Sequence, residues 1–214
     1  MRSGNSMARA VCFLLVAGAA SSVSTSGGAV SSDGSAESKP ISAARADGLM
    51  AWQQVYSVLT HPRCINCHTA TGYPQQGDDR RRHFASVVRG PADKGVPALQ
   101  CVTCHQQANA DSTGVPGAHD WHLAPLSMRW QDVNDAVLSS AEVCRAVTDR
   151  SRNGQRDGAG LLKHHTEEPL VLWAFQPGRR IDGNLRTLPP LTHEAFVEAT
   201  RKWVAAGTPC PHNP

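Results

Sequence analysis

The chain has 214 residues, of which 40% are apolar, and its formal net charge is only +3. This near-neutral balance argues against a nucleic-acid-binding protein. The apolar fraction is enough for a modest core, whereas 18 glycines and 14 prolines predict long irregular stretches. No run of 18 apolar residues occurs, so the sequence predicts no ordinary membrane-spanning helix.

The N-terminus is typical of an exported protein. Arg2 and Arg9 precede the apolar run 10–20, which contains an A-x-A-like cleavage site at 17–19. We therefore expect residues 1–20 to be a signal peptide and the protein to be periplasmic. Residues 21–46 are rich in Ser, Gly and Ala and predict a flexible leader, which leaves 47–214 as the folded domain.

The first element of that domain is a predicted amphipathic helix over residues 47–59. Apolar side chains recur every three or four positions from Leu49 to Leu59, and the helix is expected to end before Pro62. Its apolar face is expected to cover a cofactor held by the motif that follows.

Two pentapeptides of the form Cys-x-x-Cys-His follow this helix, "CINCH" at 64–68 and "CVTCH" at 101–105. A zinc site would use the four cysteines but leave both histidines without a role. A thioredoxin-like dithiol needs only one such motif. Covalent haem attachment uses every residue, because two thiols bind the vinyl groups and the adjacent histidine binds iron. The sequence therefore predicts two haem c groups, one on Cys64 and Cys67 with His68 as iron ligand, the other on Cys101 and Cys104 with His105.

The spacing of the motifs carries information on the architecture. They lie 37 residues apart, which is too short for a complete domain around each haem. The stretches 69–100 and 106–130 are punctuated by Gly and Pro and predict loops, with a turn of helix near 84–88. We expect a mostly α fold with extensive irregular loops, a compact multihaem cytochrome c architecture in which two haems share one core.

With both motifs in place, the chain resembles bacterial multihaem c-type cytochromes. The stretch from "LTHPRCINCHTATGYPQQGDD" through "WHLAPLSMRW" to "EEPLVLWAFQPGRR" is similar to small exported dihaem proteins labelled as subunits of an isoquinoline 1-oxidoreductase. The resemblance covers about residues 48–211. It implies a role as an electron-transfer subunit.

The second axial ligand of each iron is left open by the motifs. His83 lies between them in "RRRHFAS", and its placement is similar to that in small bis-His dihaem proteins such as the small subunit of periplasmic nitrate reductase. His122 is set among apolar residues and therefore needs a polar partner or a metal. Met128 lies six residues further on and would give a higher reduction potential. Further candidates are His61 and His165.

The C-terminal part is more regular. Ser139 or Ser140 is expected to cap a helix, and Thr192 another that ends at Gly207. Residues 161–175 predict a short helix, a break at Pro169 and then a buried apolar run.

Two cysteines remain outside the motifs once the signal peptide is removed. They are Cys144 and Cys210. In an oxidising compartment such a pair favours a disulfide, which is expected to staple the C-terminal helices together.

These features predict an exported electron carrier that links an oxidoreductase, such as a dehydrogenase, to a downstream acceptor protein. No catalytic residue is indicated. Two other classes stay open: a small haem enzyme, such as a peroxidase or a nitrogen-oxide reductase, and a haem-based gas or redox sensor. Both require an iron with an open position.

Overall fold

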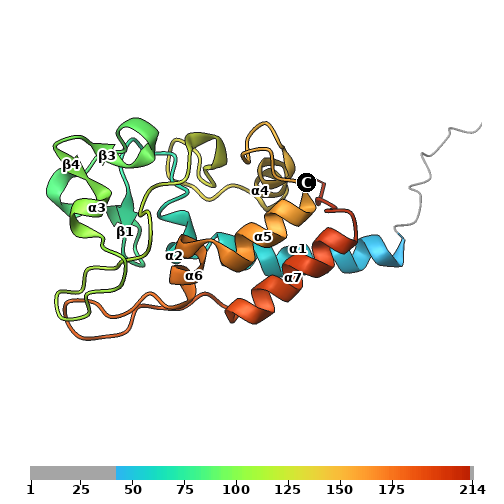
Figure 1. Ribbon diagram of the computed structural model, residues 1–214. Coiled ribbons are helices and arrows are strands. Elements are labelled where there is room, and N and C mark those ends of the chain that lie inside the picture. The colour runs from blue at the N-terminus through green and yellow to red at the C-terminus, as the bar shows by residue number, and fades with distance from the viewer. Residues whose placement is uncertain (1–41, 213–214) are drawn as a thin grey trace, which may run out of the picture. The chain divides into compact units, whose positions relative to one another are not determined.

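The structure is a computed structural model that describes residues 42–212 of the chain. The predicted signal peptide and most of the predicted leader lie outside the described residues. Within 42–212 the fold is mostly helical, with seven helices, 43% helix, little sheet and many loops (Figure 1). None of the helices in this part of the chain is long and apolar enough to cross a membrane.

The centre of the core is a pair of long helices. Helix α1 (Ala43–Leu59) begins four residues earlier than predicted because the side chain of Ser42 caps it. It packs along helix α7 (His193–Ala205). Trp52 and Trp203 are both fully buried at this contact, with ring centroids 4.8 Å apart. The amphipathic pattern read from the sequence thus corresponds to a helix–helix contact.

Two predicted helix starts are confirmed. Helix α4 (Ser140–Thr148) begins with a reciprocal cap: the Ser139 hydroxyl accepts from the N–H of Glu142, and the Glu142 carboxylate accepts from the N–H of Ser139. Helix α7 is capped by Thr192, whose hydroxyl accepts from the N–H of Ala195.

The segment between these helices differs in part from the prediction. Helix α5 (Gly158–Glu167) is followed by helix α6 (Pro169–Phe175), and the chain breaks between them as expected. The buried apolar run predicted after the break was wrong, because the segment is a helix in which only Ala174 is buried. One side of α6 packs on the core through Phe175, and Trp173 faces a cavity instead.

The predicted disulfide between Cys144 and Cys210 is present. It joins α4 to the segment after α7, with Cα atoms 5.6 Å apart. Cys144 itself is fully buried. The core around it contains Trp52, Val55, Val58, Ile65, Val143, Val147, Leu161, Phe196 and Trp203.

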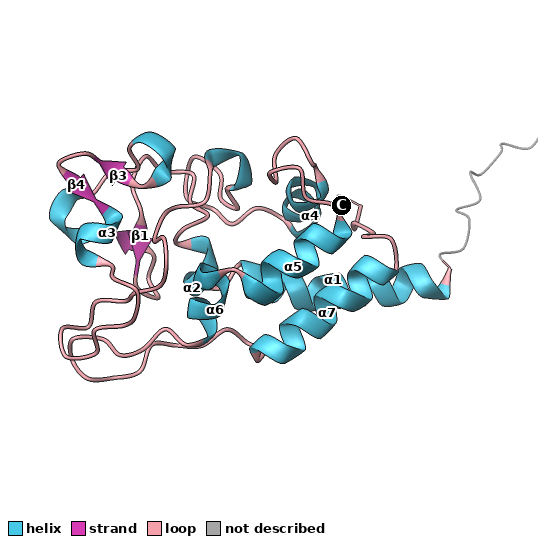
Figure 2. Cartoon of the chain, viewed as in Figure 1, coloured by secondary structure: helices cyan, strands magenta, loops and turns pink. Residues whose placement is uncertain are grey.

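The region of the two motifs is built from loops and very short elements. Two-stranded antiparallel ladders, which the sequence did not predict, stiffen it. A 3-10 turn at Phe84–Ser86 corresponds to the helical turn expected there. Figure 2 shows the strands and α3 grouped together, separate from α1, α5 and α7. The elements are α2 (Pro62–Ile65), β1 (Gln75–Gln76), β2 (Arg81–Arg82), β3 (Gly95–Val96), β4 (Leu99–Gln100) and α3 (Cys101–Cys104).

Candidate haem-binding site

Each pentapeptide folds as a single helical turn. In the first, whose Cys64 and Ile65 form the end of α2, the N–H of His68 donates to the carbonyl of Cys64 over 3.1 Å. In the second, which includes α3, the N–H of His105 donates to the carbonyl of Cys101 over 3.0 Å. Residues three apart on a helical turn share one face. The two thiols of each motif therefore lie on the same side, as attachment of both to one planar group requires.

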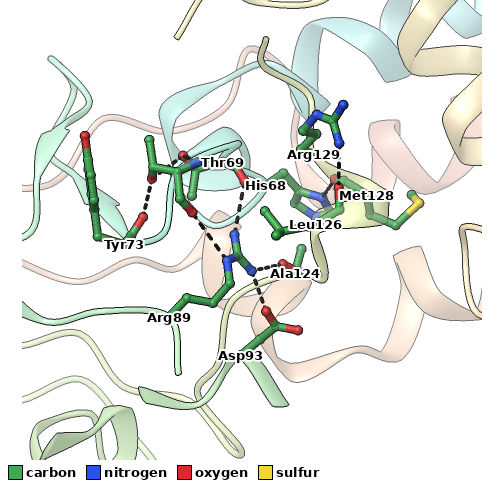
Figure 3. Close-up of polar contacts among 10 residues, drawn as sticks. His68, Thr69, Tyr73, Arg89, Asp93, Ala124, Leu126, Met128 and Arg129 are labelled. Carbon is green, nitrogen blue, oxygen red and sulfur yellow. Dashed lines mark hydrogen bonds and ion pairs between the residues drawn. The ribbon is translucent and has the colours of Figure 1, made fainter. Parts of the chain in front are cut away.

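The two motif histidines have the same polar partner. Nδ1 of His68 lies 2.7 Å from the carbonyl oxygen of Met128 (Figure 3), and Nδ1 of His105 lies 2.8 Å from that of Pro116. Because a carbonyl only accepts, Nδ1 carries the hydrogen in both rings and Nε2 keeps its lone pair. This is the arrangement found around metal-binding histidines, in which the outer N–H is held and the other nitrogen is free.

Each of these imidazoles also lies flat against an indole ring. His68 stacks on Trp130 with ring centroids 3.4 Å apart and an interplanar angle of 5°, and His105 stacks on Trp121 at 4.4 Å and 6°. Burial lowers the pKa of His68 to about 3 and also lowers the pKa of His105. Both rings are therefore neutral at pH 7, and neutral imidazole is the form that binds metals.

The chain around the first motif is held by a buried arginine. Arg89 donates from Nη1 to the Asp93 carboxylate and to the Ala124 carbonyl, both over 2.6 Å, and from Nη2 to the Thr69 carbonyl over 3.1 Å (Figure 3). Its side chain thus joins three segments next to His68. Arg89 has a structural role here and is not a free surface charge.

One cavity of about 950 Å³ is lined by residues of both motifs, although neither Cys64 nor His68 is among them. This volume is at the upper end of the range for ligand pockets, about 300–1,000 Å³. Cys67 lines it from the first motif, and Cys101, Cys104 and His105 line it from the second. The two motifs therefore border the same cavity.

Two of the motif thiols do not have the pKa values of a redox dithiol. Burial raises the pKa of Cys64 to about 12 and that of Cys67 to about 11, where the nearby Cys101 thiol adds to the effect. Reactive redox dithiols have lowered pKa values instead. Across residues 42–212, no three His, Cys, Asp or Glu side chains converge to hold a metal ion. A haem needs no such cluster, because the porphyrin itself supplies four iron ligands.

His83 is brought close to the second motif. Its ring centroid lies 6.0 Å from that of His105, with the planes inclined by 70°, and both rings line the cavity. Nδ1 of His83 lies 2.6 Å from the Phe84 carbonyl, so this nitrogen carries a hydrogen and donates it. Metal–imidazole bonds of about 2.0 Å place two rings on opposite sides of one metal about 6 Å apart. The observed separation fits that arrangement.

His122 also lines the cavity. Its Nδ1 contacts the carbonyl of Asp120 and lies 3.7 Å from the Asp120 carboxylate. His122 also lies near enough to His68 to contribute to the lowered pKa of that ring. His122 therefore lies near residues of both motifs.

His165 is not among the residues that line this cavity. It is 4% exposed, and its Nδ1 lies 2.9 Å from the hydroxyl oxygen of Thr200. That hydroxyl donates its own hydrogen to the Phe196 carbonyl, so Nδ1 of His165 is the donor. His165 thus joins α5 to α7.

The structure gives His61 and Met128 other positions. His61 caps α2, since its Nδ1 accepts from the N–H of Arg63 over 3.3 Å. The Met128 carbonyl lies on the Nδ1 side of His68, which is the side away from the free Nε2. In Figure 3 the Met128 sulfur points away from His68. The main chain of Met128 is therefore placed to orient His68.

Several residues of the site were missed from the sequence. The carbonyls of Met128 and Pro116 could not be found, because any residue can supply a backbone carbonyl. Trp121 and Trp130 carried a weak signal, since both flank the stretch that contains His122. Indole rings that stack on a ligand cannot be told from core aromatics by sequence pattern.

No protein-family model matches the chain, and neither a curated protein nor a solved structure is detectably similar to it. Functional inference therefore depends on the two motifs and the geometry around them.

Proposed function

We propose that this protein is an exported dihaem c-type cytochrome, which carries single electrons between an oxidoreductase such as a dehydrogenase and a downstream acceptor. One observation supports the proposal above all. The same geometry occurs twice: a helical turn with two thiols on one face, followed by a neutral imidazole whose Nδ1–H is held by a carbonyl and whose Nε2 is free.

The roles of the motif residues follow from this geometry. Bound haem iron supplies one-electron chemistry between the ferric and ferrous states. The chain holds each proximal imidazole neutral, stacked and fixed in orientation, so that ligation costs little reorganisation. Cys64 and Cys67 would hold one haem with His68 as proximal ligand, and Cys101 and Cys104 the other with His105.

The second iron would have an imidazole on each side. The 6.0 Å separation between His83 and His105 supports His83 as the distal ligand. Two protein ligands leave no axial position for a substrate or a gas, and this favours an electron carrier over an enzyme or a sensor. For the first iron, His122 remains the candidate because it lines the cavity and its charge is among those that lower the pKa of His68.

The shared cavity supports a compact architecture for the pair. The Cys101 thiol of the second motif lies close enough to Cys67 of the first to raise its pKa, and both line the cavity. Two haems attached there would occupy one core and exchange electrons directly. The C-terminal helices then serve as the rigid support of this core.

The test uses the full-length chain, expressed with a c-type haem maturation system. We expect export to the periplasm, a mass that exceeds the mature chain by two haems, and colour that stays with the protein after acid–acetone extraction. Optical and paramagnetic-resonance spectra are expected to show two low-spin haems. A high-spin haem that binds carbon monoxide would favour the enzyme or sensor classes. Bound zinc, or a protein without covalent haem, would overturn the proposal.

A further inference from the structure

The wall of the shared cavity carries more positive than negative charge. Four arginines and three aspartates line it. Two of the arginines are exposed and neutralised by near neighbours: Arg81 lies 2.8 Å from the Asp79 carboxylate, and Arg180 lies 2.8 Å from that of Asp182. The two remaining arginines share the single remaining aspartate.

Arg63 is the more buried of these two. Its side chain is 5% exposed and contacts the carboxylate of Asp78. That carboxylate also accepts from the Thr187 hydroxyl over 2.8 Å. The Nε–H of Arg63 is buried without a hydrogen-bond partner. A buried donor of this kind is costly unless a ligand supplies the acceptor.

Arg186 is half-buried, and the carboxylates of Asp111 and Asp78 act on its charge only from beyond ion-pair distance. Its guanidinium donates to the backbone carbonyls of Pro177, over 2.8 Å, of Arg179 and of Gly114. Among the described residues no carboxylate forms an ion pair with it. Burial, and then the positive charge of Arg63, lowers the pKa of Arg186. The two guanidinium groups therefore repel each other across the same cavity.

We infer that Arg63 and Arg186 together bind a carboxylate group of the cofactor, a haem propionate, on the wall between the two motifs. This inference rests on the proposed function. A carboxylate would accept from the free Nε–H of Arg63 and would neutralise Arg186. Arginine forks suit carboxylates in geometry as well as in charge. The pair would also favour the ferrous state of the nearby iron, because the reduced haem carries one positive charge less.

The experiment is a redox titration of the holoprotein by optical spectroelectrochemistry. Arg186→Gln is expected to lower the ferrous-to-ferric ratio of one haem at fixed potential about tenfold, a shift of about 59 mV for one electron. Arg63→Gln is expected to shift it in the same direction. Arg81→Gln removes an exposed arginine from the same wall and is expected to change the ratio less than twofold. Asp78→Asn, which removes a negative charge, is expected to shift the ratio in the opposite direction.

The signs of these shifts distinguish an electrostatic role of the two arginines from a structural one. The carboxylate site would be overturned if Arg186→Gln and Asp78→Asn shifted the potential with the same sign. It would also be overturned if both arginine-to-glutamine variants bound two haems and kept the parent potentials. Either result would leave the proposed carrier role intact. Arg63→Lys and Arg186→Lys keep the charge and provide the test where a glutamine variant fails to mature. Each lysine variant is expected to shift the ferrous-to-ferric ratio less than the glutamine variant at the same position. A parent protein without covalent haem overturns the proposed function and this inference with it.

Discussion

Replacement of both disulfide cysteines by alanine (C144A/C210A) tests how the C-terminal helices are held together. The bridge closes a sequence separation of 66 residues. In the chain-entropy model, a loop of this length restricts the unfolded chain by about 15 cal/mol/K, which corresponds to about 4 kcal/mol at 25 °C. Loss of the buried Cys144 sulfur adds about 1 kcal/mol. We therefore expect the variant to lose about 4–5 kcal/mol of unfolding free energy.

The assay is guanidinium-induced unfolding of the holoprotein, followed by far-ultraviolet circular dichroism without reductant. The single variant Cys210→Ala is the matched control, because it breaks the bridge but keeps the buried sulfur of Cys144. It is expected to lose about 4 kcal/mol. A loss below about 1 kcal/mol in the double variant would refute the reasoning. The end of α7 would then be held by packing and by the 3.0 Å hydrogen bond from Trp203 Nε1 to the Pro209 carbonyl.

Three further outcomes are expected. His83→Ala should open the second iron and produce a high-spin signal with carbon monoxide binding, whereas His61→Ala, which alters only the cap of α2, should leave both haem spectra unchanged. Ser139→Ala removes the reciprocal cap of α4 and should lower the unfolding free energy by about 1 kcal/mol in denaturant unfolding. Burial holds the pKa of His165 well below 6.5, so the unfolded chain binds a proton that the folded chain excludes. Stability should therefore be lost as pH falls below 6.5, by up to about 1.4 kcal/mol per pH unit, and His165→Gln should remove this part of the slope in unfolding curves at pH 5 and 7.

The sequence was most informative where one side chain determines the local structure. The caps at Ser139 and Thr192 were predictable because a hydroxyl before an apolar periodic run satisfies a free backbone N–H. The bridge between Cys144 and Cys210 was predictable by elimination, once the other cysteines were assigned to the motifs. In each case the signal lies within a few residues or in a rare residue type.

The rest depends on contacts that leave no pattern in the sequence. Helix α6 was read as a buried run because its apolar residues face either the core or the cavity, and sequence cannot separate the two. The early start of α1 at Ser42 was missed because its first turn, "AARA", continues the small-residue composition of the leader and has no large apolar side chain. The position of Arg63 and Arg186 on the wall of one cavity could not be predicted either, because these residues are far apart in the chain and come near each other only in the fold.

The raised pKa values of Cys64 and Cys67 bear on the order of events during biosynthesis. With pKa values of about 12 and 11, Cys64 and Cys67 are almost wholly protonated at neutral pH in the folded chain. A protonated, enclosed thiol is a poor nucleophile, whereas the same groups in the unfolded chain have ordinary reactivity. Under the proposed function, the haems would therefore be attached while the chain is still open, before the core closes around Cys64 and Cys67.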